Sequence, residues 1–172
     1  MEEIPAKAAS DSRMSLAIIT EPGQANAYGT LHGGVLLRLA DECGAIAALR
    51  HAGTGQITTA AIDSMIFLGP VYVGERVELT AEVTYVGRTS IETRVEIYSE
   101  PLEVAQRRKV AVGYALYVAL DDSGSRTRPV PPLLIRTEAD RLAQEAGRAR
   151  QALRLARRDE ARPRAESPTD AP

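Results

Sequence analysis

The chain of 172 residues is 44% hydrophobic and 26% charged, with a formal net charge of −2. That length and apolar content are enough for one domain with its own core, and the charge gives no general reason to expect nucleic acid as a partner. The single cysteine, Cys43, excludes an internal disulfide and fits a reducing compartment.

The first residues form no apolar signal segment, and no run in the sequence reaches the roughly 18 apolar residues of a membrane span. We therefore expect a cytoplasmic protein without membrane contact. Residues 1–13 carry too few apolar side chains to pack, so we expect a mobile lead-in. Residues 14–20 predict a short strand, which Pro22 and Gly23 end.

Residues 33–50 predict a long helix, because Ala and Leu are frequent and β-branched residues are rare. Only Arg38, Asp41 and Glu42 interrupt the apolar pattern before the final arginine. A helix that is apolar on nearly every side is normally enclosed by other elements. We therefore expect a buried helix with one carboxylate left inside.

Two glycines, Gly33 and Gly34, begin this helix. Backbone can approach a ligand closely at glycine, and the free N–H groups of a first helical turn attract negative charge. The sequence therefore predicts a site for an oxyanion there. At the other end, Gly53 suits a helix cap, and His51 is expected to contact the last carbonyl groups.

After residue 55 the apolar period changes from helical to two, which indicates strands. We predict an apolar-rich strand at 56–68 and a hairpin of 77–85 with 91–97. A strand at 109–120 is apolar on both faces and is expected to be central in the sheet. Four or five antiparallel strands around one helix give an α+β fold.

The alternation in the hairpin also predicts which side chains face the core. In the first strand, Tyr85 is expected to face inward and Thr84 to face water. In the second strand, Glu92, Arg94 and Glu96 are expected to lie on the solvent side. The sheet should therefore have one buried and one solvated face.

A Pro-rich connector is predicted at 121–136, followed by a helix at 137–161 that starts with a capping-box pattern. Its arginines Arg154, Arg157 and Arg158 are interpreted as a solvated face near the helix C-terminus. Residues 162–172 are expected to be a disordered tail. The sequence shows no internal repeat and no second domain.

Two stretches within residues 14–120 resemble hotdog-fold acyl-CoA thioesterases. The first is Asn26 followed by Leu31-His32-Gly33-Gly34 and Asp41. The second is 58–75 (TTAAIDSMIFLGPVYVGE) followed by 86–91 (VGRTSI). Both resemble the acyl-CoA hydrolase branch that includes the bacterial YciA type. The HGG sequence is a departure from that type and is similar to the smaller phenylacetyl-type thioesterases, so the range of acyl groups stays open.

The resemblance implies a hotdog fold, in which a long helix is wrapped by the sheet and two subunits form one continuous sheet. A geometric argument leads to the same pairing. Gly33 and Asp41 are eight residues apart, about 12 Å along one helix, which is too far for both to touch one carbonyl carbon. A second helix running antiparallel alongside brings the two groups together, so we expect a homodimer with two equal sites, assembled further into a tetramer or hexamer.

Thioester hydrolysis needs an activated water or a carboxylate nucleophile, with donors for the oxyanion. Asp41 is the expected base or nucleophile; the alternative is a solvated helix position paired with nearby charge. The amide of Gly33 is expected to polarise the thioester oxygen, unless it is a plain glycine turn. Asn26 is expected to hold the thioester or the water, with a local Asx-turn as its alternative.

Two further residues are weaker candidates for the same site. His32 is expected to touch the substrate or the leaving thiolate, with a structural hydrogen bond in the loop as the alternative. Thr59 is expected to orient Asp41 or the water, unless it is an ordinary strand threonine. Cys43 is interpreted as a small core residue. Two histidines and one cysteine offer no zinc spacing, and we expect no metal or redox cofactor.

Coenzyme A carries phosphates, so a cationic rim is expected at its binding site. By resemblance, pantetheine and nucleotide contacts fall on the turn Gly87, Arg88, Thr89 and Ser90. Gly34 is also expected to contact the substrate or coenzyme A. Residues 107–109 are a further basic stretch, for which a polar hairpin is the simpler interpretation.

The sequence thus predicts an enzyme that hydrolyses acyl-CoA to a carboxylic acid and coenzyme A. Two alternatives share the fold. A hydroxyacyl thioester dehydratase usually pairs a catalytic histidine with a carboxylate, whereas a non-catalytic acyl-CoA sensor accompanies a DNA-binding segment. No helix-turn-helix pattern precedes the domain in this sequence.

Overall fold

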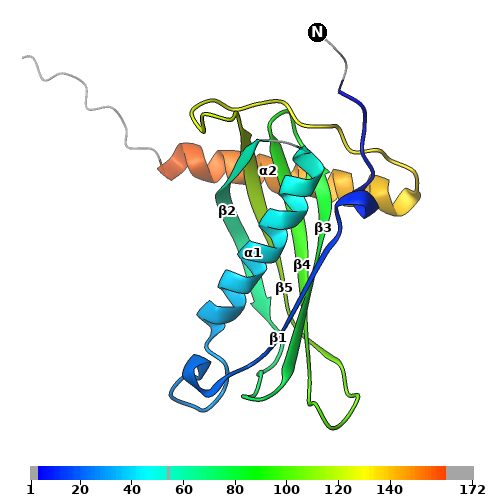
Figure 1. Cartoon of the computed structure of the whole chain (residues 1–172). Coiled ribbons are helices and arrows are strands. Elements are labelled where there is room, and N and C mark those ends of the chain that lie inside the picture. The colour runs from blue at the N-terminus through cyan, green and yellow to red at the C-terminus, as the bar shows by residue number, and fades with distance from the viewer. Residues whose placement is uncertain (1–3, 54, 162–172) are drawn as a thin grey trace, which may run out of the picture.

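The computed structural model describes residues 4–53 and 55–161. A five-stranded antiparallel sheet, in the order β1-β3-β4-β5-β2, curves around the long helix α1 (Figure 1). The elements are η1 Ala9–Ser12, β1 Met14–Ile19, η2 Pro22–Gln24, α1 Gly33–Ala52, β2 Gln56–Phe67, β3 Arg76–Val86, β4 Ser90–Glu100, β5 Arg108–Leu120 and α2 Glu138–Ala161. The predicted strands and both predicted helices are present, and β5 lies inside the sheet as expected. Within the described residues, no helix is long and apolar enough to cross a membrane.

The core lies between α1 and the concave face of the sheet. It is built from small and aliphatic side chains of one face of α1 and from the inward positions of β3, β4 and β5. Cys43 is fully buried there, and burial raises the pKa of its thiol to about 11. The opposite side of α1 is open, with Ile46 and Leu49 about two-fifths exposed. The expected enclosure of this helix is therefore incomplete within one chain.

The strand β2 is an edge of the sheet and pairs only with β5. Although it is rich in apolar residues, most of its side chains are half-buried or exposed. Ile66 and Phe67 near its end are each more than half exposed. A long, apolar edge strand is a template for pairing with another strand. The open side of α1 and the open edge of β2 are therefore exposed, partly apolar surfaces.

The predicted alternation in β3 fails near the end of the strand. The register between β3 and β4 shifts between Val83 and Tyr85, so that the side chains beyond the shift change faces. Thr84 is consequently buried and Tyr85 half-buried, which reverses the prediction. The sequence pattern of period two contains no signal for this irregularity.

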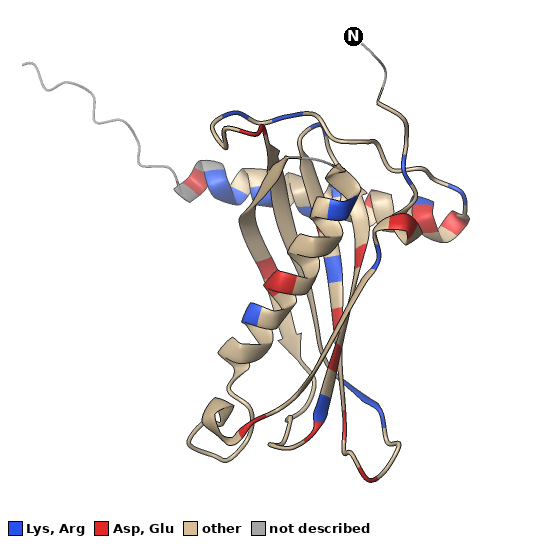
Figure 2. Ribbon diagram, in the orientation of Figure 1, with Lys and Arg blue, Asp and Glu red and all other residues tan. Residues whose placement is uncertain are grey.

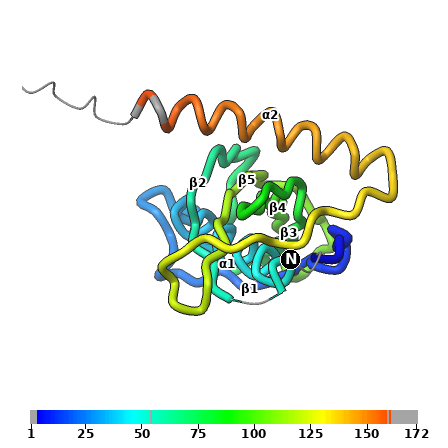
Figure 3. Tube along the Cα trace, turned by 90° about the horizontal axis from the view of Figure 1, so that it is seen from above, coloured from blue at the N-terminus to red at the C-terminus, as the bar shows by residue number. Residues whose placement is uncertain are grey.

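The C-terminal helix α2 covers part of the convex face of the sheet, on the side opposite α1 (Figure 3). Figure 2 shows many charged residues along α2, whereas α1 is mostly uncharged. Glycine at position 147 allows a close approach, because a Cβ there would lie 2.3 Å from the Cβ of Tyr85. The Gln144 side chain also accepts a hydrogen bond from the Val86 N–H at 3.1 Å.

A buried ion cluster fixes α2 on the sheet. Glu92 is fully buried and accepts hydrogen bonds from Thr84 (2.6 Å), Arg150 (2.7 and 3.0 Å) and Arg154. Arg154 also pairs with Asp63 of β2. Burial alone would raise the pKa of Glu92, but the hydrogen bonds from Arg150, Thr84 and Arg154 hold it below its ordinary value. The predictions that Glu92 faces water and that Arg154 is solvated are therefore wrong, because α2 converts this convex surface into an interior.

The segment before β1 also differs from the expected mobile lead-in, as far as it is described. Ser12 is fully buried, and its hydroxyl lies 3.2 Å from Nδ1 of His51. The other ring nitrogen of His51 lies 3.0 Å from the carbonyl oxygen of Pro131. Burial lowers the pKa of His51, so the neutral ring joins the N-terminal segment to the connector. Residues 1–3 and the predicted tail at 162–172 lie outside the described residues.

Removing the Glu92 carboxylate should destabilise the fold strongly. Glu92→Ala leaves Arg150 and Arg154 without their common partner, and breaking a buried ion pair in this way costs about 3 kcal/mol or more. The free energy of unfolding from urea titration measures the effect. Glu82→Ala is the matched control, because its pair with Arg13 is exposed and should contribute less than about 1 kcal/mol. Equal losses in the two variants would contradict this account of α2.

Candidate functional site

Asp41 lies midway along α1, on the side of the helix that contacts β2. Its Oδ1 accepts a hydrogen bond from the hydroxyl of Thr59 at 3.0 Å. Arg38 pairs instead with Glu42 at 2.5 Å on the exposed side of the helix. The structure therefore brings the predicted pair Asp41 and Thr59 together, and the neighbouring charges pair with each other.

The Asp41 carboxylate borders a narrow, mainly apolar cleft between α1 and the sheet. The cleft has a volume of about 10 Å³, close to the space of one water molecule. Its lining consists of Leu37, Ala40, Asp41, Ile62, Met65, Val95, Gly113, Tyr114 and Ala115. Ile62 belongs to the edge strand and is 42% exposed. The cleft therefore lies beside the open edge of the sheet.

A third group reaches Asp41 from β5. The hydroxyl of Tyr117 lies 3.1 Å from the backbone oxygen of Asp41 and 3.3 Å from its Oδ1. Tyr117 is fully buried. Sequence reasoning missed this residue, because it lies within an apolar strand and far from both recognised stretches.

Gly44, one turn after Asp41, makes room for this tyrosine. A Cβ at position 44 would lie 2.5 Å from the Tyr117 hydroxyl oxygen and 2.7 Å from Oγ1 of Thr93. A glycine in the middle of a helix normally costs stability. Here its absence of a side chain lets the tyrosine hydroxyl approach the helix backbone.

Gly33 begins α1, two turns before Asp41. Its N–H has no hydrogen-bond acceptor among the described residues, as expected for the first residue of a helix. A Cβ at this position would meet the ring of Phe67 at 3.4 Å, an ordinary contact. The amide therefore lies near the end of β2, whereas Asp41 lies near its beginning.

The other predicted residues of this loop are engaged in local hydrogen bonds. Oδ1 of Asn26 accepts from the N–H groups of Tyr28 (2.8 Å) and Thr30 (3.2 Å), and Nδ2 donates to the Thr30 hydroxyl at 2.9 Å. These bonds form the local Asx-turn that was the alternative to a catalytic role for Asn26. The second N–H of its side-chain amide remains for a ligand. The exposed His32 caps α1 through Nδ1, which accepts from the Gly34 N–H at 2.9 Å. His32 thus forms a structural hydrogen bond in the loop, which was the alternative to contact with the substrate. This bond uses the N–H of Gly34.

The predicted coenzyme A turn lies on the convex side of the sheet, away from the start of α1. Thr89 and Ser90 border a cavity of about 370 Å³ between β2, β5 and α2. The remaining lining residues are Ala60, Ala61, Leu116, Val118, Thr127, Gln151, Arg154, Leu155 and Arg158. Arg88 is exposed beside it, and the Gly87 N–H closes the turn on the Ser90 carbonyl at 2.8 Å. The cavity thus adjoins β2 at the residues next to Thr59, and α2 supplies a wall that the sequence did not predict.

A thioesterase superfamily model matches residues 28–106. The chain is also 35% identical over 119 residues to the uncharacterized acyl-CoA thioester hydrolase YkhA of Bacillus subtilis, which is 69% of this chain and 68% of that protein. The chain belongs to the thioesterase superfamily, on its acyl-CoA hydrolase branch. The human cytosolic acyl coenzyme A thioester hydrolase is 32% identical over 141 residues, 81% of this chain. This thioesterase-family chain spans only 37% of the length of that human relative.

Solved structures of the superfamily confirm the predicted hotdog fold. An acyl-CoA hydrolase from Staphylococcus aureus, in complex with butyryl coenzyme A, coenzyme A and coenzyme A disulfide, matches with a TM-score of 0.82 and 32% identity over 91% of this chain and 94% of that one. An apo-hexameric acyl-CoA thioesterase matches with a TM-score of 0.83 and 34% identity over 90% and 97% of the two chains. The S. aureus enzyme has also been solved with an aspartate, an asparagine or a threonine replaced by alanine.

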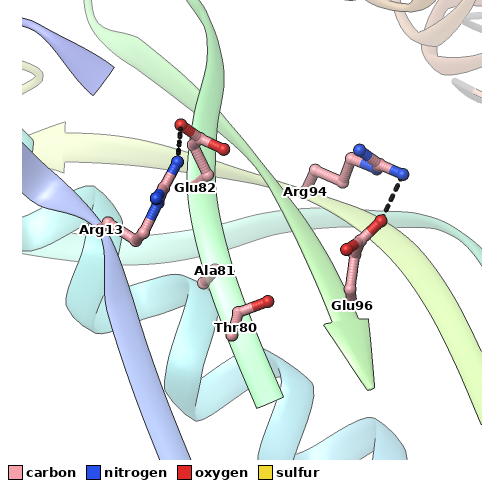
Figure 4. A pocket seen from close by; sticks show the side chains of 6 residues that line it. All are labelled: Arg13, Thr80, Ala81, Glu82, Arg94 and Glu96. Atoms are coloured by element: carbon pink, nitrogen blue, oxygen red, sulfur yellow. Dashed lines mark hydrogen bonds and ion pairs between the residues drawn. The ribbon is translucent and has the colours of Figure 1, made fainter. Parts of the chain in front are cut away.

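A separate hollow of about 240 Å³ lies over β3 and β4 and is lined by Arg13, Thr80, Ala81, Glu82, Arg94 and Glu96 (Figure 4). Arg13 of the N-terminal segment pairs there with Glu82 at 2.8 Å, and Arg94 pairs with Glu96. Both cations are therefore already neutralised by carboxylates. The hollow offers no unpaired charge to a phosphate and lacks the apolar lining of the Asp41 cleft, so it is a poor candidate for the site of this thioesterase-family chain.

Gly44→Ala should destabilise the protein although alanine favours helices. The gain in helix propensity is about 1 kcal/mol, but the new Cβ collides with Tyr117 and Thr93, and overpacking costs about 1–3 kcal/mol. The free energy of unfolding should therefore fall. Gly69→Ala is the control, because a Cβ there meets open space. A Gly44→Ala variant more stable than wild type would show that Tyr117 does not need this space.

Proposed function

We propose that the protein hydrolyses acyl-CoA thioesters to a carboxylic acid and coenzyme A, in a homodimer whose two sites each use groups from both subunits. The observation that carries this proposal is the Asp41 carboxylate, oriented by Thr59 beside an apolar cleft at the open edge of the sheet. The alanine variants of the S. aureus relative concern the residue types of Asp41, Asn26 and Thr59, which supports the same set here.

The position of the two half-sites along β2 supports the dimer. Thr59 contacts Asp41 near the start of the strand, and Phe67 lies next to Gly33 at its end. An antiparallel pairing of two β2 strands centred on Asp63, midway between them, sets Thr59 of one subunit opposite Phe67 of the other. Asp41 then faces the partner's Gly33. The pairing also covers the exposed apolar side chains of β2, and relatives described as hexameric support an oligomer.

In the proposed reaction, Asp41 takes a proton from a water molecule as the oxygen of that water attacks the thioester carbon. The amide N–H of Gly33 from the other subunit stabilises the negative charge on the carbonyl oxygen. The carbon–sulfur bond then breaks, and the leaving sulfur of coenzyme A takes the proton from Asp41, so that the thiol leaves and the carboxylate is restored. The free N–H of Asn26 is available to hold the water or the thioester. Direct attack by the Asp41 carboxylate is the variant mechanism and forms a mixed anhydride. Label found in Asp41 after a single turnover in ¹⁸O-labelled water would establish direct attack, because a general base takes no oxygen from water.

Coenzyme A is proposed to extend from the Asp41 cleft across the subunit boundary to the cavity under α2. The turn Gly87 to Ser90 supplies backbone groups there, and Arg88 supplies a cation for a phosphate. The mechanism uses only side chains, a backbone amide and water, so no metal or redox cofactor has a role in it.

A thiol-release assay with short, long and aromatic acyl-CoA substrates tests the proposed activity. Wild type should release coenzyme A, and Asp41→Asn should lower kcat about a thousandfold while remaining folded. With a 3-hydroxyacyl-CoA, the thioesterase gives free thiol, whereas a dehydratase gives an enoyl product and none. Binding without turnover of any substrate would favour a sensor and contradict the proposal.

The role of the Gly33 amide can be tested by removing one hydrogen. Gly33→Pro deletes the N–H, yet proline suits the first position of a helix, and His32 before it already has extended backbone angles. We expect kcat to fall roughly a hundredfold. Gly33→Ala keeps the N–H and should retain most activity. If both variants lose activity equally, the effect is steric, and the oxyanion role of this amide is wrong.

A further inference from the structure

Tyr117 is a buried polar side chain that no step of the proposed reaction uses. It is fully buried on β5, and it is not among the residues that line the Asp41 cleft. Its hydroxyl has one proton to donate, and two oxygens of Asp41 lie within hydrogen-bond distance of it, the backbone oxygen at 3.1 Å and Oδ1 at 3.3 Å. The hydroxyl of Thr93 also lies beside it. This hydroxyl therefore contacts the candidate base from behind, without access to a substrate.

The two oxygens of the Asp41 carboxylate differ in their hydrogen bonds. Oδ1 lies within hydrogen-bond distance of two hydroxyl groups, those of Thr59 and Tyr117. No hydrogen bond is formed by Oδ2 among the described residues. A carboxylate anchored through one oxygen has a fixed rotation about its Cα–Cβ and Cβ–Cγ bonds, and the other oxygen has a fixed direction. Oδ2 is thus the oxygen that remains for a water molecule or a carbonyl carbon.

The surroundings of Tyr117 keep the hydroxyl in place and protonated. Burial and the negative charge of Asp41 raise its pKa, so the tyrosine stays a donor over the whole physiological range. Gly44 provides the space in which the hydroxyl reaches the helix. A phenylalanine-sized ring would fill the same volume at lower desolvation cost, so packing alone does not account for a hydroxyl here.

We propose that Tyr117 is a positioning residue for the hydrolysis: its hydroxyl, together with that of Thr59, holds Oδ1 of Asp41 so that Oδ2 is presented to the reacting water. This inference rests on the proposed function. A purely structural role is the competing explanation, in which the hydroxyl only satisfies the backbone oxygen of Asp41. The two explanations differ in what removal of the hydroxyl does to kcat and to the carboxylate itself.

Tyr117→Phe removes the hydroxyl and keeps the ring. We expect kcat to fall about tenfold, while KM and the urea midpoint of unfolding stay near the wild-type values. Tyr98→Phe is the matched control, because the hydroxyl of Tyr98 also donates to a carboxylate, that of Glu96 at 2.8 Å, on another part of the sheet. Wild-type kcat in Tyr117→Phe, or a variant that no longer folds, would assign the hydroxyl to the fold alone and overturn the proposal.

A second measurement does not depend on turnover. In a crystal structure of Tyr117→Phe, the Asp41 carboxylate should be rotated or split between orientations, whereas Tyr98→Phe should leave it unchanged. An Asp41 carboxylate that keeps its wild-type orientation in Tyr117→Phe overturns the positioning role. Absence of hydrolysis by wild type would instead refute the proposed function, so the two failures are distinguishable.

Discussion

The distance between Gly33 and Asp41 along one rigid helix constrains the whole site. Eight residues of α helix separate the amide from the carboxylate by about 12 Å, and no side-chain movement within one chain can bring them to the same carbonyl group. The strand β2 runs past both groups, since Thr59 contacts Asp41 and Phe67 lies next to Gly33. Under the proposed mechanism the site therefore requires a second copy, and the open strand edge and the partly exposed α1 are the surfaces that this copy would cover.

The helix α2 gives the convex face of the sheet an interior of its own. Its arginines converge on Glu92, and Arg154 continues to Asp63 on β2. The same helix forms one wall of the cavity that the predicted coenzyme A turn borders. The ion cluster therefore connects β2, β4 and α2, which links the stability of α2 to the shape of the proposed nucleotide site.

The architecture was predictable from the sequence because its signals are local. The spacing of apolar residues changes from a helical period to a period of two, which distinguishes α1 from the four strands after it. The spacing of Gly33 and Asp41 in the sequence is enough for the dimer argument. The pairing of Thr59 with Asp41 was predicted from the position of Thr59 just inside the strand that faces the helix. The failures are all long-range. Glu92 and Arg154 each look like surface residues until α2 is placed on the sheet, and the shift at Thr84 depends on the neighbouring strand.

Tyr117 shows the same limit at the site itself. Nothing in an apolar strand sequence indicates that its tyrosine will contact a particular residue of the helix.

The claim that each site combines two subunits is tested most directly by mixing variants. Asp41→Asn and Gly33→Pro subunits, carrying different affinity tags, should each be nearly inactive alone. Purified mixed dimers should contain one intact site and regain about half of the wild-type thiol release per dimer. Verified mixed dimers that remain as inactive as their parents would contradict the shared site.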